Sequence, residues 1–196
     1  MTTFSVPTHD KDKGFFDFRV EAGSVMFAGS RHLEIPDQVC SDLIKAFSFH
    51  GFSFITGCAT GVDHSFRRAL ALSESRESSL VACAFKERAD RIRDICSLFV
   101  VPEGLHPRAA LAKRTLWLVN RCSLLVLFPS DPIGKGSALA FRSAIYACKP
   151  VFVVSKTRPK ESHLYKVLYS NLFGVVEGWW CIPHIYQETG LTNEEV

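Results

Sequence analysis

Three short glycine-bearing segments, each directly after an apolar run, hold the residues of this chain that could do chemistry. Glycine after a strand lets the backbone turn sharply and lets a ligand approach the backbone N–H groups closely. A helix that begins just beyond the turn adds unpaired donors and a positive dipole end, which together favour phosphate. The segments are Gly29-Ser30-Arg31, Gly57-Cys58-Ala59-Thr60-Gly61-Val62-Asp63 and Gly134-Lys135-Gly136-Ser137.

The first two turns offer different polar groups. Ser30 and Arg31 supply a hydroxyl and a guanidinium, and a guanidinium can hold phosphate oxygens in a two-pronged contact. An ordinary turn with a surface arginine has the same sequence. In the second turn, Asp63 falls in the first turn of the helix that follows. Two roles are open for it: stabilising the helix start electrostatically, or accepting a hydrogen bond from a ribose hydroxyl.

The third turn resembles the P-loop of nucleotide triphosphatases only superficially. That motif requires a glycine, four residues, and then Gly-Lys-Ser/Thr. Here Lys135 is followed by Gly136, and Pro129 stands five positions before Gly134. A triphosphatase site is therefore disfavoured, and the turn is interpreted as a phosphate-cradling loop with Lys135 as a point charge.

Buried strands must position these turns. Six runs that are mostly uncharged and continuously apolar are typical of strands buried on both faces of a mainly parallel sheet: 25–28, 52–56, 80–85, 97–101, 123–128 and 151–154. Helical spacing of apolar residues predicts helices over 37–49, 62–75, 86–96, 108–121 and 137–148. The alternation predicts an α/β fold: a Rossmann-like, doubly wound sheet of about six strands with helices on both faces. Such sheets bind ligands beyond the carboxyl ends of their strands, so all three turns are expected to line one crevice there.

The chain is expected to contain one main domain with two additions. Residues 1–23 are predicted to be a loosely ordered lead-in, residues 24–155 the Rossmann-like domain, and residues 156–196 an extension that packs on the core. Within the extension, apolar spacing predicts a helix over 161–172, and the segment from Phe173 has strand character. Three roles are open for Trp179 and Trp180: closing the core, packing against another subunit, or stacking on bases.

Composition restricts the class of protein. The 196 residues are 47% hydrophobic and 22% charged, which is ordinary for a folded domain with a full core. No apolar stretch reaches the roughly 18 residues of a membrane helix, and the polar N-terminus argues against a signal peptide. We therefore expect a cytoplasmic protein with no membrane partner. The net charge of +3 is only a weak argument for nucleic acid.

The seven cysteines contain no C-x-x-C pair, and most lie inside apolar runs. That pattern favours buried free thiols in a reducing compartment. Cys58 differs because it lies inside a glycine turn, where it is either a reactive thiol or a small residue that fills space. The histidines show no metal-ligand spacing, so neither a metal nor a cofactor is expected.

The order of the three turns, with Arg114 ahead of the strand 123–128, resembles the SLOG superfamily over residues 24–155. That group includes the DprA/Smf DNA-processing proteins and the LOG phosphoribohydrolases. The resemblance implies a Rossmann-like domain that binds nucleotides or single-stranded nucleic acid, often as a homodimer. The DprA-like branch has an arginine followed by asparagine where this chain has Arg114 and Thr115. The other residues that match its motifs by position are Gly29, Ser30, Arg31, Gly57, Gly61 and Asp63.

The LOG branch carries a catalytic glutamate a few residues beyond its third turn. Here Ser137 is followed by Ala138-Leu139-Ala140-Phe141, so no carboxylate is placed to assist departure of a base from ribose. We therefore expect a DprA-like protein that binds a nucleotide or the phosphate backbone of single-stranded DNA, without evident catalysis. Two alternatives are a LOG-type N-glycosidic hydrolase that uses Asp63 as its acid, and a protein-interaction module with a vestigial crevice. The candidate ligand-binding residues are Gly29, Ser30, Arg31, Gly57, Thr60, Gly61, Asp63, Arg114, Gly134, Lys135, Gly136 and Ser137.

Overall fold

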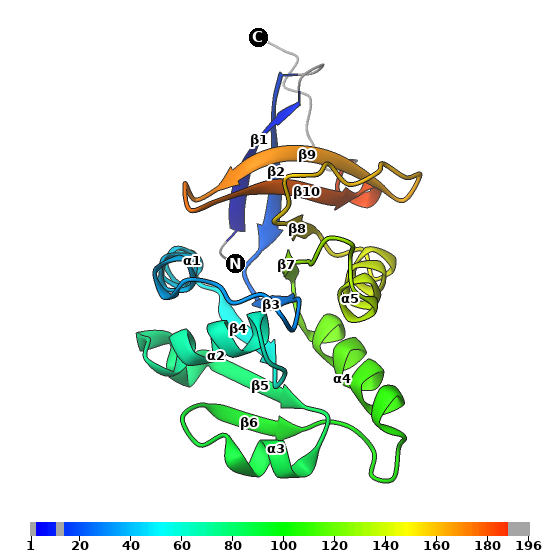
Figure 1. Cartoon of the computed structure of the whole chain (residues 1–196). Coiled ribbons are helices and arrows are strands. Elements are labelled where there is room, and N and C mark those ends of the chain that lie inside the picture. The colour runs from blue at the N-terminus through cyan, green and yellow to red at the C-terminus, as the bar shows by residue number, and fades with distance from the viewer. Residues whose placement is uncertain (1–2, 11–13, 188–196) are drawn as a thin grey trace.

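The structure, a computed structural model, describes residues 3–10 and 14–187 and contains one sheet of ten strands within them (Figure 1). The strands are β1 (Thr3–Asp10), β2 (Gly14–Glu21), β3 (Ser24–Gly29), β4 (Ser53–Gly57), β5 (Ser79–Cys83), β6 (Cys96–Phe99), β7 (Leu124–Phe128), β8 (Val151–Val153), β9 (Tyr165–Leu172) and β10 (Val176–Pro183). The α-helices are α1 (Asp37–Phe49), α2 (Val62–Ala71), α3 (Lys86–Arg91), α4 (Pro107–Arg121) and α5 (Lys135–Tyr146). Two short 3-10 helices are η1 (Glu74–Ser78) and η2 (His184–Gln187).

Six neighbouring strands, in the order β8-β7-β3-β4-β5-β6, form the parallel half of the sheet. They coincide with the six apolar runs that the sequence predicts as strands. All five residues of β7, which lies inside this half, are buried. The α/β, Rossmann-like fold class is therefore confirmed, and the whole sheet is wider than the six strands expected.

Helices cover both faces of the parallel half (Figure 1). Alternate residues of β3 show this directly, because Phe27 belongs to the apolar cluster of α1 and α2 and Met26 to that of α4 and α5. Phe27 stacks on Phe66 of α2, with ring centroids 3.9 Å apart. The carboxyl ends of β3, β4 and β7 thus lie at one edge between two layers of helices.

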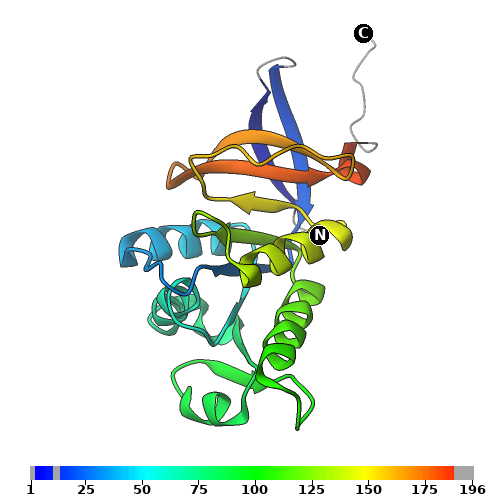
Figure 2. The ribbon, with the colours of Figure 1, turned by 45° about the vertical axis from the view of Figure 1, so that its right-hand side comes forward.

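The other four strands, in the order β2-β1-β9-β10, join the sheet at β8 through antiparallel pairs (Figure 2). Trp180 of β10 is fully buried against the ring of Phe152, at a centroid distance of 5.0 Å, so it closes the core. Trp179 is half-buried, and its indole N–H donates to the carbonyl of Ser155.

Two predictions outside the parallel half are wrong. The expected helix over 161–172 is instead β9, which pairs along its whole length with β10. The expected lead-in over 1–23 contains the hairpin of β1 and β2, and residues 1–2 and 11–13 of it lie outside the described part. The extension over 156–196 is described as far as residue 187.

Candidate ligand-binding pocket

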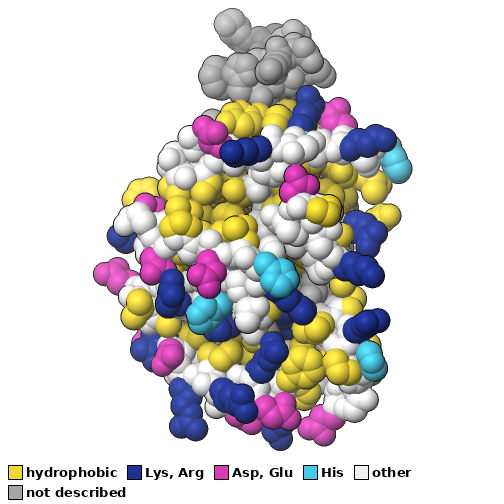
Figure 3. Space-filling view, in the orientation of Figure 1, with side chains coloured by type: hydrophobic (Ala, Val, Ile, Leu, Met, Phe, Trp, Pro, Cys, Tyr) yellow, Lys and Arg dark blue, Asp and Glu magenta, His cyan; other side chains and the backbone are white. Residues whose placement is uncertain are grey.

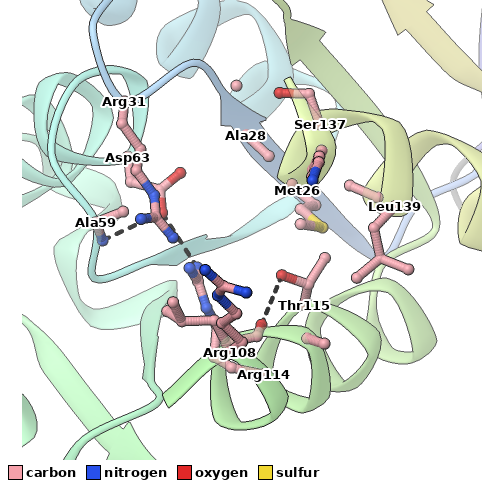
Figure 4. Close-up of a pocket in the computed structure, with 16 residues that line it drawn as sticks. Met26, Ala28, Arg31, Ala59, Asp63, Arg108, Arg114, Thr115, Ser137 and Leu139 are labelled. Carbon is pink, nitrogen blue, oxygen red and sulfur yellow. Dashed lines mark hydrogen bonds and ion pairs between the residues drawn. The ribbon is translucent and has the colours of Figure 1, made fainter. Parts of the chain in front are cut away.

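A pocket of about 440 Å³ opens at the carboxyl end of β3, between α4 and α5 (Figure 4). Residues from all three glycine turns contribute to its wall, and α4 supplies one side of it. The lining residues are Met26, Ala28, Gly29, Arg31, Ala59, Asp63, Arg108, Leu111, Ala112, Arg114, Thr115, Lys135, Gly136, Ser137, Leu139 and Ala140.

Seven of the twelve residues that the sequence selects line this pocket: Gly29, Arg31, Asp63, Arg114, Lys135, Gly136 and Ser137. The other five stand outside its wall: Ser30, Gly57, Thr60, Gly61 and Gly134. The pocket therefore brings the three turns together without using every residue of each.

An ion pair fills the second turn. Nη1 of Arg114 lies 3.1 Å from Oδ2 of Asp63, and both side chains are more than nine-tenths buried. The N–H of Ala59 donates to the same oxygen at 3.3 Å. A Cβ on Gly57 would lie 1.4 Å from Nη1 of Arg114, so only glycine leaves room for the ion pair. Neither role that the sequence left open for Asp63 includes this contact.

Backbone contacts also tie the second turn to the first. Gly61 adopts φ = +65°, and a Cβ there would lie 2.4 Å from the carbonyl oxygen of Ser30. That oxygen accepts the N–H of Val62 at 3.1 Å, and the hydroxyl of Thr60 donates to the carbonyl of Arg31. The N–H of Val62, the first of α2, is therefore taken by the protein's own backbone. In these two turns the glycines serve internal packing rather than an open approach to backbone donors.

The third turn is more open than the second, because not even the first N–H of its helix has an acceptor within the described residues. Helix α5 begins at Lys135 without a side-chain cap on its free N–H groups. Within the described residues, no acceptor bonds to the N–H of Lys135, Gly136 or Ser137. A Cβ on Gly136 would meet nothing within 4 Å, so packing does not require glycine at this position.

Positive charge gathers around the pocket. Its lining contains four cationic side chains and one carboxylate, that of Asp63. The cations are Arg31, Arg108, Arg114 and Lys135. Nε of Arg114 is buried and has no hydrogen-bond partner within the described part of the chain. Over the face shown in Figure 3, basic and acidic side chains alternate without a large basic patch. The lining of the pocket is therefore locally positive.

Sequence reasoning missed Arg108 and the apolar side of the pocket. Arg108, Leu111, Ala112 and Thr115 stand at i, i+3, i+4 and i+7 on α4, which places them on one face of the helix. The spacing is visible in the sequence, but only the fold shows which face of α4 is turned toward the glycine turns.

The described residues contain no cluster of histidine, cysteine, aspartate or glutamate that could hold a metal ion. Among the helices that the structure describes, none combines the length and apolar character needed to span a membrane.

The sequence matches no protein-family model, and no curated protein is similar to it at a significant level. Solved structures do resemble the fold. DNA processing protein A (DprA) from Helicobacter pylori, described by its single-stranded DNA binding mode, matches with a TM-score of 0.54 and 15% identity, over 83% of this chain and 84% of that one. DprA from Streptococcus pneumoniae matches with a TM-score of 0.54 and 14% identity, over 69% of this chain and 51% of that one. The structural-genomics target TM1055 matches with a TM-score of 0.50 and 15% identity, over 69% of this chain and 75% of that one.

At these identities the likeness establishes the fold. The Rossmann-like fold that the resemblance implies is thereby confirmed.

Proposed function

We propose that the pocket binds a phosphate-bearing ligand, either a nucleotide or the backbone of single-stranded DNA, and that the third turn holds the phosphate. The observation that carries the proposal is the open start of α5. Its first N–H groups have no acceptor within the described residues, and they line a pocket with four cationic side chains. Free donors at a helix start favour an anion, and Lys135 adds a full charge beside them.

A second observation points to the same kind of ligand. Burying a guanidinium N–H without a partner costs free energy, because the group gives up its hydrogen bonds to water. Nε of Arg114 is in this state on the pocket wall. Because this atom has no exposed surface, an anionic oxygen or a base acceptor in the pocket would become its partner after a shift of the guanidinium toward the ligand. The ion pair with Asp63 holds the guanidinium in place for that contact.

The remaining wall suits an apolar, flat group. Met26, Leu111 and Leu139 add apolar side chains to the lining, and Figure 4 shows Met26 and Leu139 close to each other. A volume of about 440 Å³ lies within the range of small-molecule sites, roughly 300–1,000 Å³. A nucleotide base could occupy this wall while its phosphate reaches α5.

The fold likeness supports a nucleic-acid ligand, because the Helicobacter pylori DprA is described by its binding of single-stranded DNA. A homodimeric state and a cytoplasmic location belong to the same proposal, on the basis of the family resemblance and the composition.

The hydrolase alternative has less support. It needs Asp63 as an acid, and Oδ2 of Asp63 already accepts from both Arg114 and the N–H of Ala59. A carboxylate held in this way is better suited to fixing the arginine than to moving a proton. We therefore propose binding without catalysis.

Ligand screening by thermal unfolding tests the proposal. The probes are mononucleotides, dinucleotides and a short oligodeoxythymidine. A ligand at about 100 times its Kd should add about 2.7 kcal/mol of stability. For a domain of this size that corresponds to a rise in Tm of roughly 5–10 °C. Release of free base over time would favour the hydrolase instead. If no phosphate compound moves Tm while a protein partner does, the interaction-module alternative gains and the proposal is wrong.

A further inference from the structure

Two thiols stand side by side on neighbouring strands, outside the contacts that the proposed function uses. Cys58 directly follows β4, and Cys83 is the last residue of β5. Gly57 pairs with Ala82 in the parallel register, so the next pair along the two strands is Cys58 with Cys83. Neighbouring strands lie about 4.7–4.9 Å apart, within the Cα separation of about 4.4–6.8 Å that a disulfide spans.

The surroundings of this pair favour a thiolate on Cys58. The neighbouring thiol of Cys83 lowers the pKa of Cys58 against the opposing effect of burial. The N–H of Ala84 and the guanidinium groups of Arg88 and Arg114 lower the same pKa further. The pKa of Cys83 is raised, because Cys58 lies beside it and because it is buried.

Three other buried cysteines, outside this pair, have a raised pKa, whereas the pKa of Cys58 is lowered. Burial raises the pKa of the thiols of Cys40, Cys122 and Cys181. Thiols of that kind stay protonated and react slowly with oxidants. Cys58 is also the more accessible member of its own pair, since it keeps 6% of its surface exposed whereas Cys83 has none.

We propose that Cys58 is a site of oxidative modification by hydrogen peroxide and that Cys83 resolves the product into a disulfide. The sulfur of Cys58 attacks the peroxide, so that an S–O bond forms, the O–O bond breaks and one water leaves. The sulfur of Cys83 then attacks that of Cys58, so that the S–S bond forms, the S–O bond breaks and a second water leaves. Overall, the two thiols lose two hydrogen atoms and one peroxide is reduced to two waters.

The modification would change the turn that holds the ion pair of Asp63 and Arg114. Cys58 lies between Gly57, which packs on Arg114, and Ala59, which donates to Asp63. A bond to Cys83 replaces the thiolate near two arginines by an uncharged group. The second turn would therefore sense oxidant directly.

The test is mass spectrometry of the folded protein after limited treatment with hydrogen peroxide. The two exposed cysteines are first removed by Cys96→Ser and Cys148→Ser, so that surface oxidation does not compete. We expect the intact protein to lose two hydrogen atoms and a digest to contain a Cys58–Cys83 cross-linked peptide. In the same background, Cys83→Ser should stop at a sulfenic acid on Cys58 that dimedone traps.

Thermal unfolding before treatment shows which variants are folded. The cross-link itself is measured in the protein with Cys96→Ser and Cys148→Ser alone, in which Cys58 and Cys83 are both unchanged. The proposal is overturned if Cys58 and Cys83 both remain alkylatable after unfolding of the peroxide-treated protein. It is also overturned if Cys40 or Cys122 oxidises as fast as Cys58. The readout is the mass of the protein itself, so a failure of ligand binding leaves it unaffected.

Discussion

The second and third glycine turns have similar compositions and opposite environments. At the second turn, a Cβ on Gly57 would overlap the guanidinium of Arg114, and Gly61 has a positive φ against the carbonyl of Ser30. At the third turn, a Cβ on Gly136 would meet nothing. Glycine in the second turn is thus explained by the protein's own packing. In the third turn packing gives no explanation, and the approach of a ligand supplies one.

The comparison separates stability from binding. Changes in the second turn should cost folding free energy, because buried groups lose their partners or their space. Changes in the third turn should leave folding nearly unaffected and weaken binding.

Gly57→Ala should give the largest loss of stability. The added methyl group displaces Arg114 from Asp63, and breaking a buried ion pair costs about 3–5 kcal/mol. Guanidinium unfolding monitored by circular dichroism measures the loss. Gly134→Ala is the matched control, because a Cβ there meets only the hydroxyl of Ser130 at 3.6 Å, an ordinary contact. Equal stability of the two variants would show that the ion pair does not require Gly57.

Gly61→Ala should also cost stability, about 1–3 kcal/mol from backbone strain alone, because its conformation of φ = +65° and ψ = −128° is strained for any residue with a Cβ. The contact with Ser30 adds to the loss. The same unfolding experiment measures it. A loss smaller than that of Gly134→Ala would contradict the role assigned to the contact between the first two turns.

Lys135→Ala should leave stability within about 0.5 kcal/mol, because the side chain is exposed and has no partner within the described residues. Loss of one charge at the phosphate should weaken binding of the most effective nucleotide or oligodeoxythymidine by roughly tenfold, about 1.4 kcal/mol. Isothermal titration calorimetry measures the affinity. Lys113→Ala, an exposed lysine of α4 outside the pocket, is the matched control. Equal affinities of the two variants would remove Lys135 from the site.

The parallel half of the fold could be predicted from the sequence because both of its signals are strong. Strands buried on two faces are continuous apolar runs, and the helix over 37–49 matches α1 at both ends. The prediction of a helix over 161–172 is wrong because Leu164, Leu168 and Leu172 are spaced by four residues. That spacing fits a helix and a strand equally. In β2, the alternation of Phe16, Phe18 and Val20 is a strand signal that the sequence contains.

The pocket could be predicted only in part. The turns were found from glycine spacing, but the contact between Asp63 and Arg114 joins residues 51 positions apart. No local pattern shows that these side chains meet, so the structural reason for Gly57 could not be found from the sequence. The same holds for Arg108, whose direction depends on how α4 packs.

Gly136→Ala is expected to have the smallest effect on folding and tests the central claim most directly. The variant should be as stable as the original protein, or up to about 1 kcal/mol more stable, because alanine favours a helix over glycine and the site has room. The same methyl group should obstruct the N–H groups at the start of α5 and weaken binding of the phosphate ligand by about 1–2 kcal/mol. Unchanged or improved folding together with weakened binding is the predicted result, measured by unfolding and calorimetry on the same preparation. Unchanged affinity in a folded Gly136→Ala variant would contradict the assignment of the phosphate to the third turn.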